Sequence, residues 1–261
     1  MRLMPACRSL FFTFLLAFIS ATHISPQSPP AGEAALSPTL NQVIQKLGSR
    51  APEDAVILGN VTITAGSTEE KGTVRIVTKK TTHTVETFDT PTTSHHVVFA
   101  AGVAAERKKN GLKELPFGRS LSARSALSPL TFIASRLEEA KVQVEDLGPE
   151  AVDGRSALHL RISNDWSKDK YVAGYQEFTK CDVWVDPVTF LPRAISFSQR
   201  EGLGAIPWVA VRVEYDDYRA IGGFLYPYHI TKYVNGTKWA DIDVTSIAFN
   251  TGVAAEEFAI K

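Results

Sequence analysis

The sequence has almost no cysteine. Of its 261 residues only Cys7 and Cys181 carry a thiol, and Cys7 lies in a segment that we expect to be removed (below). One remaining thiol cannot form an internal disulfide, which excludes a disulfide-stapled scaffold. Cys181 alternates with Val183 and Val185, and this places it on an apolar strand face. The pattern therefore favours a buried small side chain over a nucleophile.

The usual catalytic signatures are also missing. The chain contains no G-x-G-x-x-G, P-loop, H-E-x-x-H, paired C-x-x-C or G-x-S-x-G sequence, which are the common marks of nucleotide, zinc, redox and acyl-transfer sites. His95 and His96 are adjacent on a predicted strand, so their side chains point to opposite faces and cannot bind one ion together. The sequence predicts no catalytic residue, no metal site and no cofactor.

An excess of charge of one sign is absent. The chain has 28 basic and 28 acidic residues, with 44% apolar and 21% charged residues, which is ordinary globular composition. Removing residues 1–21 takes away Arg2 and Arg8 and no acid, leaving 26 basic against 28 acidic residues. A nucleic-acid-binding protein needs a basic surface, so we expect no nucleic-acid partner.

Only one long hydrophobic run occurs, over residues 10–19. Arg2 and Arg8 precede it and Ala21 offers a cleavage point, so residues 1–21 are predicted to be a signal peptide. A membrane-spanning helix needs about 20 apolar residues, twice this length, although an uncut N-terminal anchor is the alternative. Cys7 precedes the run and so is not a lipobox cysteine. We expect an exported, soluble periplasmic protein in which residues 22–35 form a Pro-rich spacer.

Two segments have helical patterns. Ser37-Pro38 is a favoured helix start, the apolar residues that follow it have helical spacing, and Gly48 ends the pattern. Ser128-Pro129 begins a second segment, with Leu130, Ile133 and Leu137 on one face. Both helices are predicted to be amphipathic and to cover an apolar surface.

The rest of the chain alternates with period two, which predicts about ten or eleven antiparallel strands. The runs lie at 56–65, 74–78, 84–88, 97–99, 157–163, 176–186, 193–200, 209–218, 224–234 and 238–249. Asn235-Gly236 is a strong hairpin signal between the last two runs. No linker interrupts the series, so residues 36–261 are expected to form a single domain, mainly β. Up-and-down strands of this number commonly close, or nearly close, into a barrel.

One face of the later strands is continuously apolar, and the other is mostly polar. We predict that the apolar side chains face inward and line a cavity, together with the inner residues of the second helix. The candidate ligand-binding residues are Val183, Val185, Ile195, Phe197, Val211, Val213, Tyr215, Tyr228, Ile230, Ile242, Val244, Leu130, Ile133 and Leu137. Two short helices must cover all these strands, so the sheet either curls and fills itself or curls around a space.

Asp241 and Asp243 form the one carboxylate pair of interest. Two residues apart on a strand, they share a face at about 7 Å, which suits a hydrolase pair or a cation site. Thr245 continues that face while Ile242 and Val244 take the other. A solvated outer face accounts for this pattern, and it is the interpretation that we favour.

Three segments have a recognisable pattern. Residues 183–193 read VWVDPVTFLPR, residues 215–230 read YDDYRAIGGFLYPYHI, and residues 247–258 contain Asn250, Val253 and Phe258. The first resembles the W-[VI]-D-P-x-T-x-L-P-x-R hairpin of the exported LolA-like proteins. The second resembles their D-Y-R…G…P-x-x-I segment, and the third resembles their closing N-x-x-[IV]-x-x-x-x-F pattern. These motifs are turns and strand ends, so they indicate a fold more than a ligand.

The resemblance implies a strongly curved, open antiparallel sheet, a half-barrel with helices in its concave side. It also implies a non-enzymatic role in binding or carrying lipids or lipoprotein acyl chains. An envelope sensor or scaffold of the same fold, with a filled interior and a protein partner, is the alternative. An unrecognised hydrolase is a further one, and it would need titratable groups inside the cavity.

Overall fold

Thirteen antiparallel strands form one sheet in the described part of the chain. The computed structural model describes residues 37–108, 110–121, 124–139, 141–199 and 208–260. The strand order is β6-β5-β4-β3-β2-β1-β13-β12-β11-β10-β9-β8-β7, so only the β1–β13 pair joins strands distant in sequence. β6 and β7 are opposite edges of this sheet, which is open and not closed into a barrel. The predicted signal peptide and spacer lie outside the described residues.

The strands are β1 (Asp54–Ala65), β2 (Thr68–Lys79), β3 (His83–Asp89), β4 (Ser94–Ala100), β5 (Val103–Lys108), β6 (Gly111–Glu114), β7 (Val142–Val152), β8 (Arg155–Asn164), β9 (Cys181–Val185), β10 (Pro192–Gln199), β11 (Val209–Ile221), β12 (Phe224–Val234) and β13 (Thr237–Phe249). The helices are α1 (Pro38–Leu47), α2 (Phe117–Leu121), α3 (Pro129–Leu137) and the 3-10 helices η1 (Ala173–Thr179) and η2 (Ala255–Phe258).

The sequence prediction missed three strands and extended another too far. β5, β6 and β7 were not predicted, because β6 has only four residues and β7 is mostly exposed and carries Gly148-Pro149. The strand predicted over 176–186 is wrong at its start, where residues 176–179 belong to η1. In β7, a register shift between Asp146 and Gly148 accommodates the irregular sequence.

The two long helices begin where their serines and prolines predict. Ser37 Oγ accepts a hydrogen bond from the Leu40 amide at 3.2 Å, and Gly48 follows the last turn with φ 140°. Ser128 differs from the expected cap: its hydroxyl bonds Thr131 Oγ1 at 3.1 Å and makes no bond to a backbone amide. Proline at the first position therefore remains the main start signal of α3.

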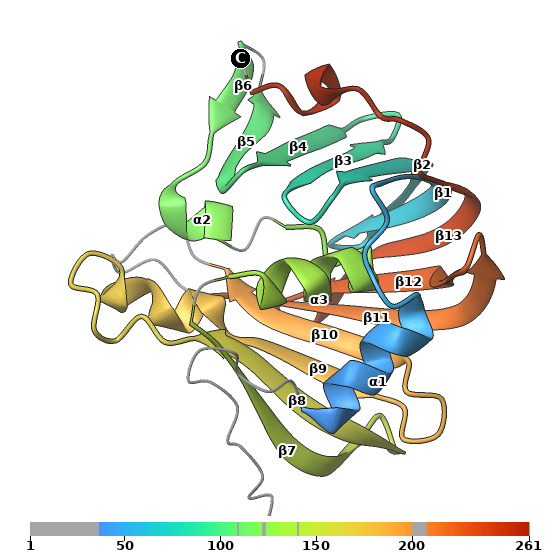
Figure 1. Cartoon of the computed structure of the whole chain (residues 1–261). Helices are drawn as coiled ribbons and strands as arrows, with labels where there is room; N and C mark the ends of the chain where they lie inside the picture. The colour runs from blue at the N-terminus through green and yellow to red at the C-terminus, as the bar shows by residue number, and fades with distance from the viewer. Residues whose placement is uncertain (1–36, 109, 122–123, 140, 200–207, 261) are drawn as a thin grey trace, which may run out of the picture. The chain divides into compact units, whose positions relative to one another are not determined.

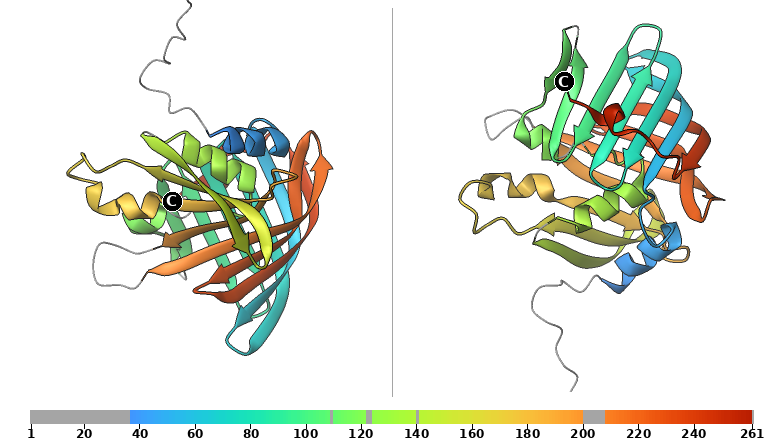
Figure 2. Two further views of the ribbon diagram at one scale, coloured as in Figure 1. Left: turned by 90° about the horizontal axis from the view of Figure 1, so that it is seen from below. Right: turned by 45° about the horizontal axis from the view of Figure 1, so that its top comes forward.

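The three α-helices lie on one side of the sheet, which curves around them (Figures 1 and 2). The predicted facing of the later strands is confirmed. Phe197, Val211, Val213 and Ile230 are 0–8% exposed within one hydrophobic cluster, whereas the alternate residues Arg212, Glu214 and Ser198 are half-buried. The structure is thus the open half-barrel that the resemblance implied, with helices in its concave side.

The C-terminal segment covers the opposite, convex face of β2–β4. Phe258 is buried with Val77, Val85 and Val98 in a second, smaller cluster. At the start of β1, the Asp54 carboxylate accepts hydrogen bonds from the amides of Thr251, Gly252 and Val253 at 2.6–3.2 Å. The closing sequence motif therefore anchors the chain end to the sheet.

Residues 186–193, DPVTFLPR, form the turn from β9 into β10. Asp186 Oδ1 accepts the amides of Val188 and Thr189 at 2.9 and 2.8 Å, and Arg193 pairs with the other carboxylate oxygen. Burial alone would raise the pKa of Asp186, but these donors outweigh it and lower the pKa to about 2. This motif has a structural task, as the sequence interpretation expected.

Candidate functional site

The concave face is an apolar wall. The predicted sheet residues Val183, Val185, Ile195, Phe197, Val211, Val213, Tyr215, Ile230, Ile242 and Val244 are 0–8% exposed and lie in one cluster with Leu130 and Ile133 of α3. Tyr228 and Leu137 are partly buried and contact the same cluster. The structure thus brings together every residue that the sequence proposed for a ligand-binding wall. Their side chains fill much of the space on the concave side of the sheet.

Two tyrosines tie the segment before α3 to this wall. Tyr215 on β11 donates to the Ala126 carbonyl at 2.6 Å, and Tyr226 on β12 donates to the Leu127 carbonyl at 2.7 Å. Burial raises the pKa of both phenols, so they remain neutral donors. These contacts fix where α3 begins over the sheet.

Buried charge secures the far end of α3. Arg136 is 4% exposed and donates to the Thr179 carbonyl, and its guanidinium lies 3.2 Å from Glu139, which also pairs with Arg124. Burial, together with the nearby Arg136, lowers the pKa of Arg124 to about 10. α3 is therefore held by polar contacts at both ends and by apolar contacts between them.

A groove of about 530 Å³ lies between α1 and α3. Ile44 of α1 faces Leu130, Ala134 and Leu137 of α3 across it. Residues 49–53, residues 80–82 and Glu138 complete its lining and bring charged side chains to its rim. Small-molecule sites commonly have volumes of 300–1,000 Å³. Because Leu130, Ile44 and Leu137 also contact the main cluster, the groove borders the apolar interior between the two helices that the sequence predicted to cover it.

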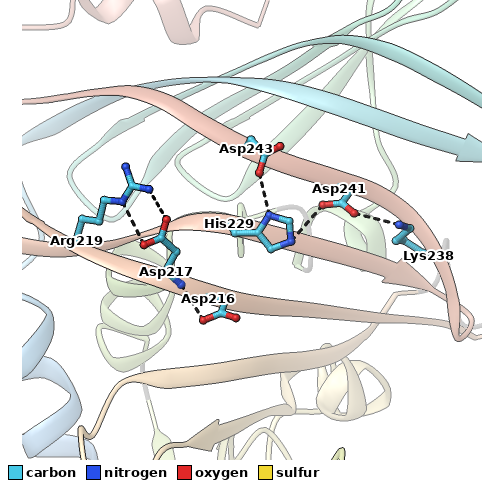
Figure 3. Close-up of polar contacts among 7 residues, drawn as sticks. All are labelled: Asp216, Asp217, Arg219, His229, Lys238, Asp241 and Asp243. Atoms are coloured by element: carbon cyan, nitrogen blue, oxygen red, sulfur yellow. Dashed lines mark hydrogen bonds and ion pairs between the residues drawn. The ribbon is translucent and has the colours of Figure 1, made fainter.

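The carboxylate pair of the sequence prediction lies on the convex face (Figure 3). His229 Nδ1 is 3.0 Å from Asp243 Oδ1, and His229 Nε2 is 3.3 Å from Asp241 Oδ1. Lys238 Nζ contacts the other oxygen of Asp241 at 3.0 Å. The two carboxylates bind opposite sides of one imidazole, with side chains 29% and 77% exposed. This is a solvated polar network, as the interpretation of the outer face expected.

A second hollow, of about 480 Å³, lies beside this network on the convex face. Its lining is charged, and several of the charges are paired: Arg193 with Asp186, and Arg212 with Asp153 and Glu214. Within the described residues, no group of three or more His, Cys, Asp or Glu side chains is arranged to hold a metal ion. The hollow thus follows from the turn and edge contacts around it.

Cys181 is fully buried in the main cluster. Burial raises the pKa of its thiol to about 12. Since the thiolate is the nucleophilic form, this side chain is inert at neutral pH, and the prediction of a buried small side chain is confirmed.

Sequence reasoning missed the charged side chains on the concave face. Glu86 of β3 and His95 of β4 share that face with Phe88, because Glu86 pairs with Ile76 of β2 and His95 with Phe88. Lys232 of β12 pairs with buried Val213 and Ala240 and so also points inward. Lys232 continues the alternation of Tyr228 and Ile230, and that pattern could have identified it.

The fold is LolA-like. A LolA superfamily protein from Nitrosomonas europaea superposes with a TM-score of 0.55 at 14% identity, covering 84% of this chain and 97% of that one. A domain from Vibrio parahaemolyticus, named for outer membrane lipoprotein sorting, gives 0.54 at 13% identity over 84% and 95% of the two chains. A DUF1329 family protein from Desulfovibrio piger gives 0.56 at 12% identity over 85% and 95%.

At the level of sequence, neither a family model nor a curated protein matches the chain. The similarity is therefore one of fold. Among the helices that the structure describes, none has the length and apolar character needed to cross a membrane.

Proposed function

We propose that this protein is an exported, non-enzymatic binding protein that holds the acyl chain of a lipid or lipoprotein between α1, α3 and the concave face. The observation that carries the proposal is the groove of about 530 Å³ between the two helices, with Ile44, Leu130, Ala134 and Leu137 in its lining and a direct border on the main cluster. The shared fold with a domain named for lipoprotein sorting supports the same class of ligand.

Burial of methylenes supplies the affinity in this proposal. Each methylene removed from water contributes about 0.8 kcal/mol, so a long chain binds without a charged contact. The side chains that now fill the wall limit the depth of entry, and α3 has to shift for a long chain to reach Phe197 or Val213. The segment before α3 is held by hydrogen bonds from Tyr215 and Tyr226, which can break and re-form.

Export and a periplasmic location belong to the same proposal. They follow from the predicted signal peptide over residues 1–21 and from the spacer over 22–35, with residues 36–261 as one binding domain. N-terminal sequencing of the protein purified from its cells is expected to begin near residue 22. A chain that begins at Met1 would contradict the predicted cleavage.

The direct test fills the groove. Ala134 of α3 lines it and is half-buried, so Ala134→Phe is expected to weaken binding of a fluorescent fatty acid at least about tenfold, the effect of losing roughly two buried methylenes. Ala248→Phe is the matched control, because Ala248 is exposed on β13. Native mass spectrometry of the purified wild-type protein is expected to show a bound lipid.

The packed interior favours one other function, a scaffold or sensor that binds a protein partner. In that case wild-type protein binds neither fluorescent fatty acid nor lipopeptide, and it is purified without lipid. That result would contradict the carrier function and leave the scaffold in its place.

A further inference from the structure

A smaller cavity, distinct from the groove and from the convex hollow, lies on the concave face between β3–β4 and β10–β12. Its volume is about 80 Å³, which is room for several water molecules or for one small polar group. Its lining includes the charged or titratable side chains Glu86, His95, Arg119, Arg124 and Lys232. These side chains come from three different strands and from the segment around α2, so the fold assembles the cluster from distant parts of the sequence.

Lys232 has hydrogen-bonding capacity that nothing in the described part of the chain fills. Its side chain is 18% exposed, and its Nζ lies 4.0 Å from Glu86 Oε2, which is beyond hydrogen-bond distance. The ammonium also lies 4.8 Å from the centroid of the Trp239 ring, a cation–π contact that uses none of its three N–H donors. Glu86 and Trp239 therefore hold the lysine in place and leave its donors available.

Arg124 contributes a second incompletely satisfied cation. One of its terminal nitrogens pairs with Glu139, but its Nε is buried and has no hydrogen-bond partner among the described residues. The Arg124 side chain is 18% exposed. A buried donor without a partner costs free energy, so the buried Nε of Arg124 and the available donors of Lys232 together suit an oxyanion.

The imidazole of His95 adds no charge to this cluster at neutral pH. Burial lowers the pKa of His95, Lys232 and Arg119 lower it further, and Glu86 and Glu106 partly offset them. The charges of Lys232 and Arg119 thus already affect the pKa of one side chain at the cavity, His95.

We propose that this cavity binds the carboxylate headgroup of a long-chain acid, so that the ligand of the protein is an anionic single-chain amphiphile. A carboxylate offers two oxygens to the Lys232 and Arg124 donors. Leu127, Phe197 and Val213 line the same cavity and belong to the main apolar cluster, which places the first methylenes against an apolar wall. This inference rests on the proposed function, because the acyl chain must also bind.

The test compares ligands with the same chain and different headgroups by isothermal titration calorimetry. Palmitate is expected to bind wild-type protein about tenfold or more tightly than hexadecanol, the effect of one charge-assisted hydrogen bond. Hexadecyltrimethylammonium is expected to bind no more tightly than hexadecanol. Acetate and inorganic phosphate lack the chain and are expected not to bind at millimolar concentration.

Substitution of the lysine locates the effect. Lys232→Met keeps the length of the side chain and removes its charge, so the preference for palmitate over hexadecanol is expected to fall below about threefold while hexadecanol affinity is retained. Lys238→Met is the matched control, because Lys238 lies in the outer network at 42% exposure, and it is expected to keep the wild-type preference.

The outcomes separate the two proposals. Equal affinity of wild-type protein for palmitate and hexadecanol overturns the headgroup site and leaves acyl-chain binding intact. Binding of free phosphate or acetate as tight as that of palmitate overturns the lipid assignment, since the cavity would then be a small-anion site. Failure of every long-chain probe overturns the proposed function itself. The wild-type series needs no variant, so these results do not depend on the folding of Lys232→Met.

Discussion

The two faces of β11–β13 differ in burial and in polarity. On the concave face Val213, Ile230 and Ile242 are at most 1% exposed. One residue further along the same strands, His229, Asp241 and Asp243 form a polar network on the convex face (Figure 3). Side chains alternate across a strand, so a single backbone serves both environments. The consequence of a substitution here depends on which face of the sheet the side chain occupies, and not on where along the strand the residue lies.

At β2–β4 both faces carry buried apolar residues. The convex face has Val77, Val85 and Val98, which Phe258 covers. The concave face has Val74, Ile76 and Phe88 in the main cluster, and Glu86 and His95 lie on the same face beside Lys232. The comparison with β11–β13 shows that a covering segment makes the convex face apolar as well.

The largest effect is expected where a charge enters the apolar half. Ile195 is fully buried between Val183 and Val213, so Ile195→Asp is expected to lower the free energy of unfolding by about 4 kcal/mol or more, because a carboxylate there has no partner. Ser196→Asp is the control, because Ser196 is the next residue and lies on the opposite face with Arg212. This variant is expected to change the free energy of unfolding by less than about 0.5 kcal/mol. Urea denaturation measures both, and similar values would contradict the assigned facing.

The next effect tests the covered convex face of β2–β4. Phe258 is 3% exposed and joins the convex cluster. Phe258→Ala is expected to lower the free energy of unfolding by about 3 kcal/mol, the lower end of the range for replacing a buried phenylalanine with alanine. The loss is at the lower end because a terminal segment can detach and leave no rigid cavity. Hydrogen exchange is expected to rise at η2 and along β2–β4 while β9–β11 keep their protection. Uniform loss of protection would show that the segment does not act locally.

The Asp186 carboxylate on the convex side contributes to the stability of the fold because backbone amides donate hydrogen bonds to it. The pKa of Asp186 is about 2 in the folded protein, against about 3.9 in an unfolded chain. Because the folded value is the lower one, the contribution is fully present above about pH 4 and is lost as pH falls toward 2. Because solvent screens this partly exposed group, its contribution to the free energy of unfolding is limited to about 1–2 kcal/mol.

Asp186→Asn is therefore expected to lower the free energy of unfolding by about 1–2 kcal/mol at pH 7 and to have little effect near pH 2. Denaturation measured across this range tests the sign. A loss of stability that is independent of pH would show that the turn needs the shape of the side chain and not its charge.

The sequence predicted the fold to the extent that alternation and turn chemistry determine it. Ser37-Pro38, Ser128-Pro129 and Asn235-Gly236 each mark a boundary found in the structure. Asn235 and Gly236 have positive φ values of 49° and 76°, as a tight hairpin requires. β6 and β7 were missed because edge strands have no second neighbour to bury them and so carry no apolar pattern.

The candidate site was predictable only in part. Parity alone identified the apolar wall, since every proposed sheet residue lies on the concave side. The groove and the charged cavity depend on where α1, α3 and residues 124–127 cross the sheet, which no local pattern encodes. Lys232 and Glu86 come from β12 and β3, strands that β1, β2 and β13 separate in the sheet, so their proximity arises from the curvature of the sheet.

The smallest effect is expected in the outer network, and its absence would be as informative as the losses above. Asp243 is 77% exposed, and Asp241 is 29% exposed with Lys238 beside it. Exposed ion pairs contribute about 0–1 kcal/mol, so Asp241→Ala and Asp243→Ala are each expected to change the free energy of unfolding by less than about 0.5 kcal/mol. Binding of palmitate is expected to remain at the wild-type level, because the network lies across the sheet from the groove and the charged cavity. If either variant weakened lipid binding, the convex face would take part in function, and the division between a binding face and a solvated face at β11–β13 would be wrong.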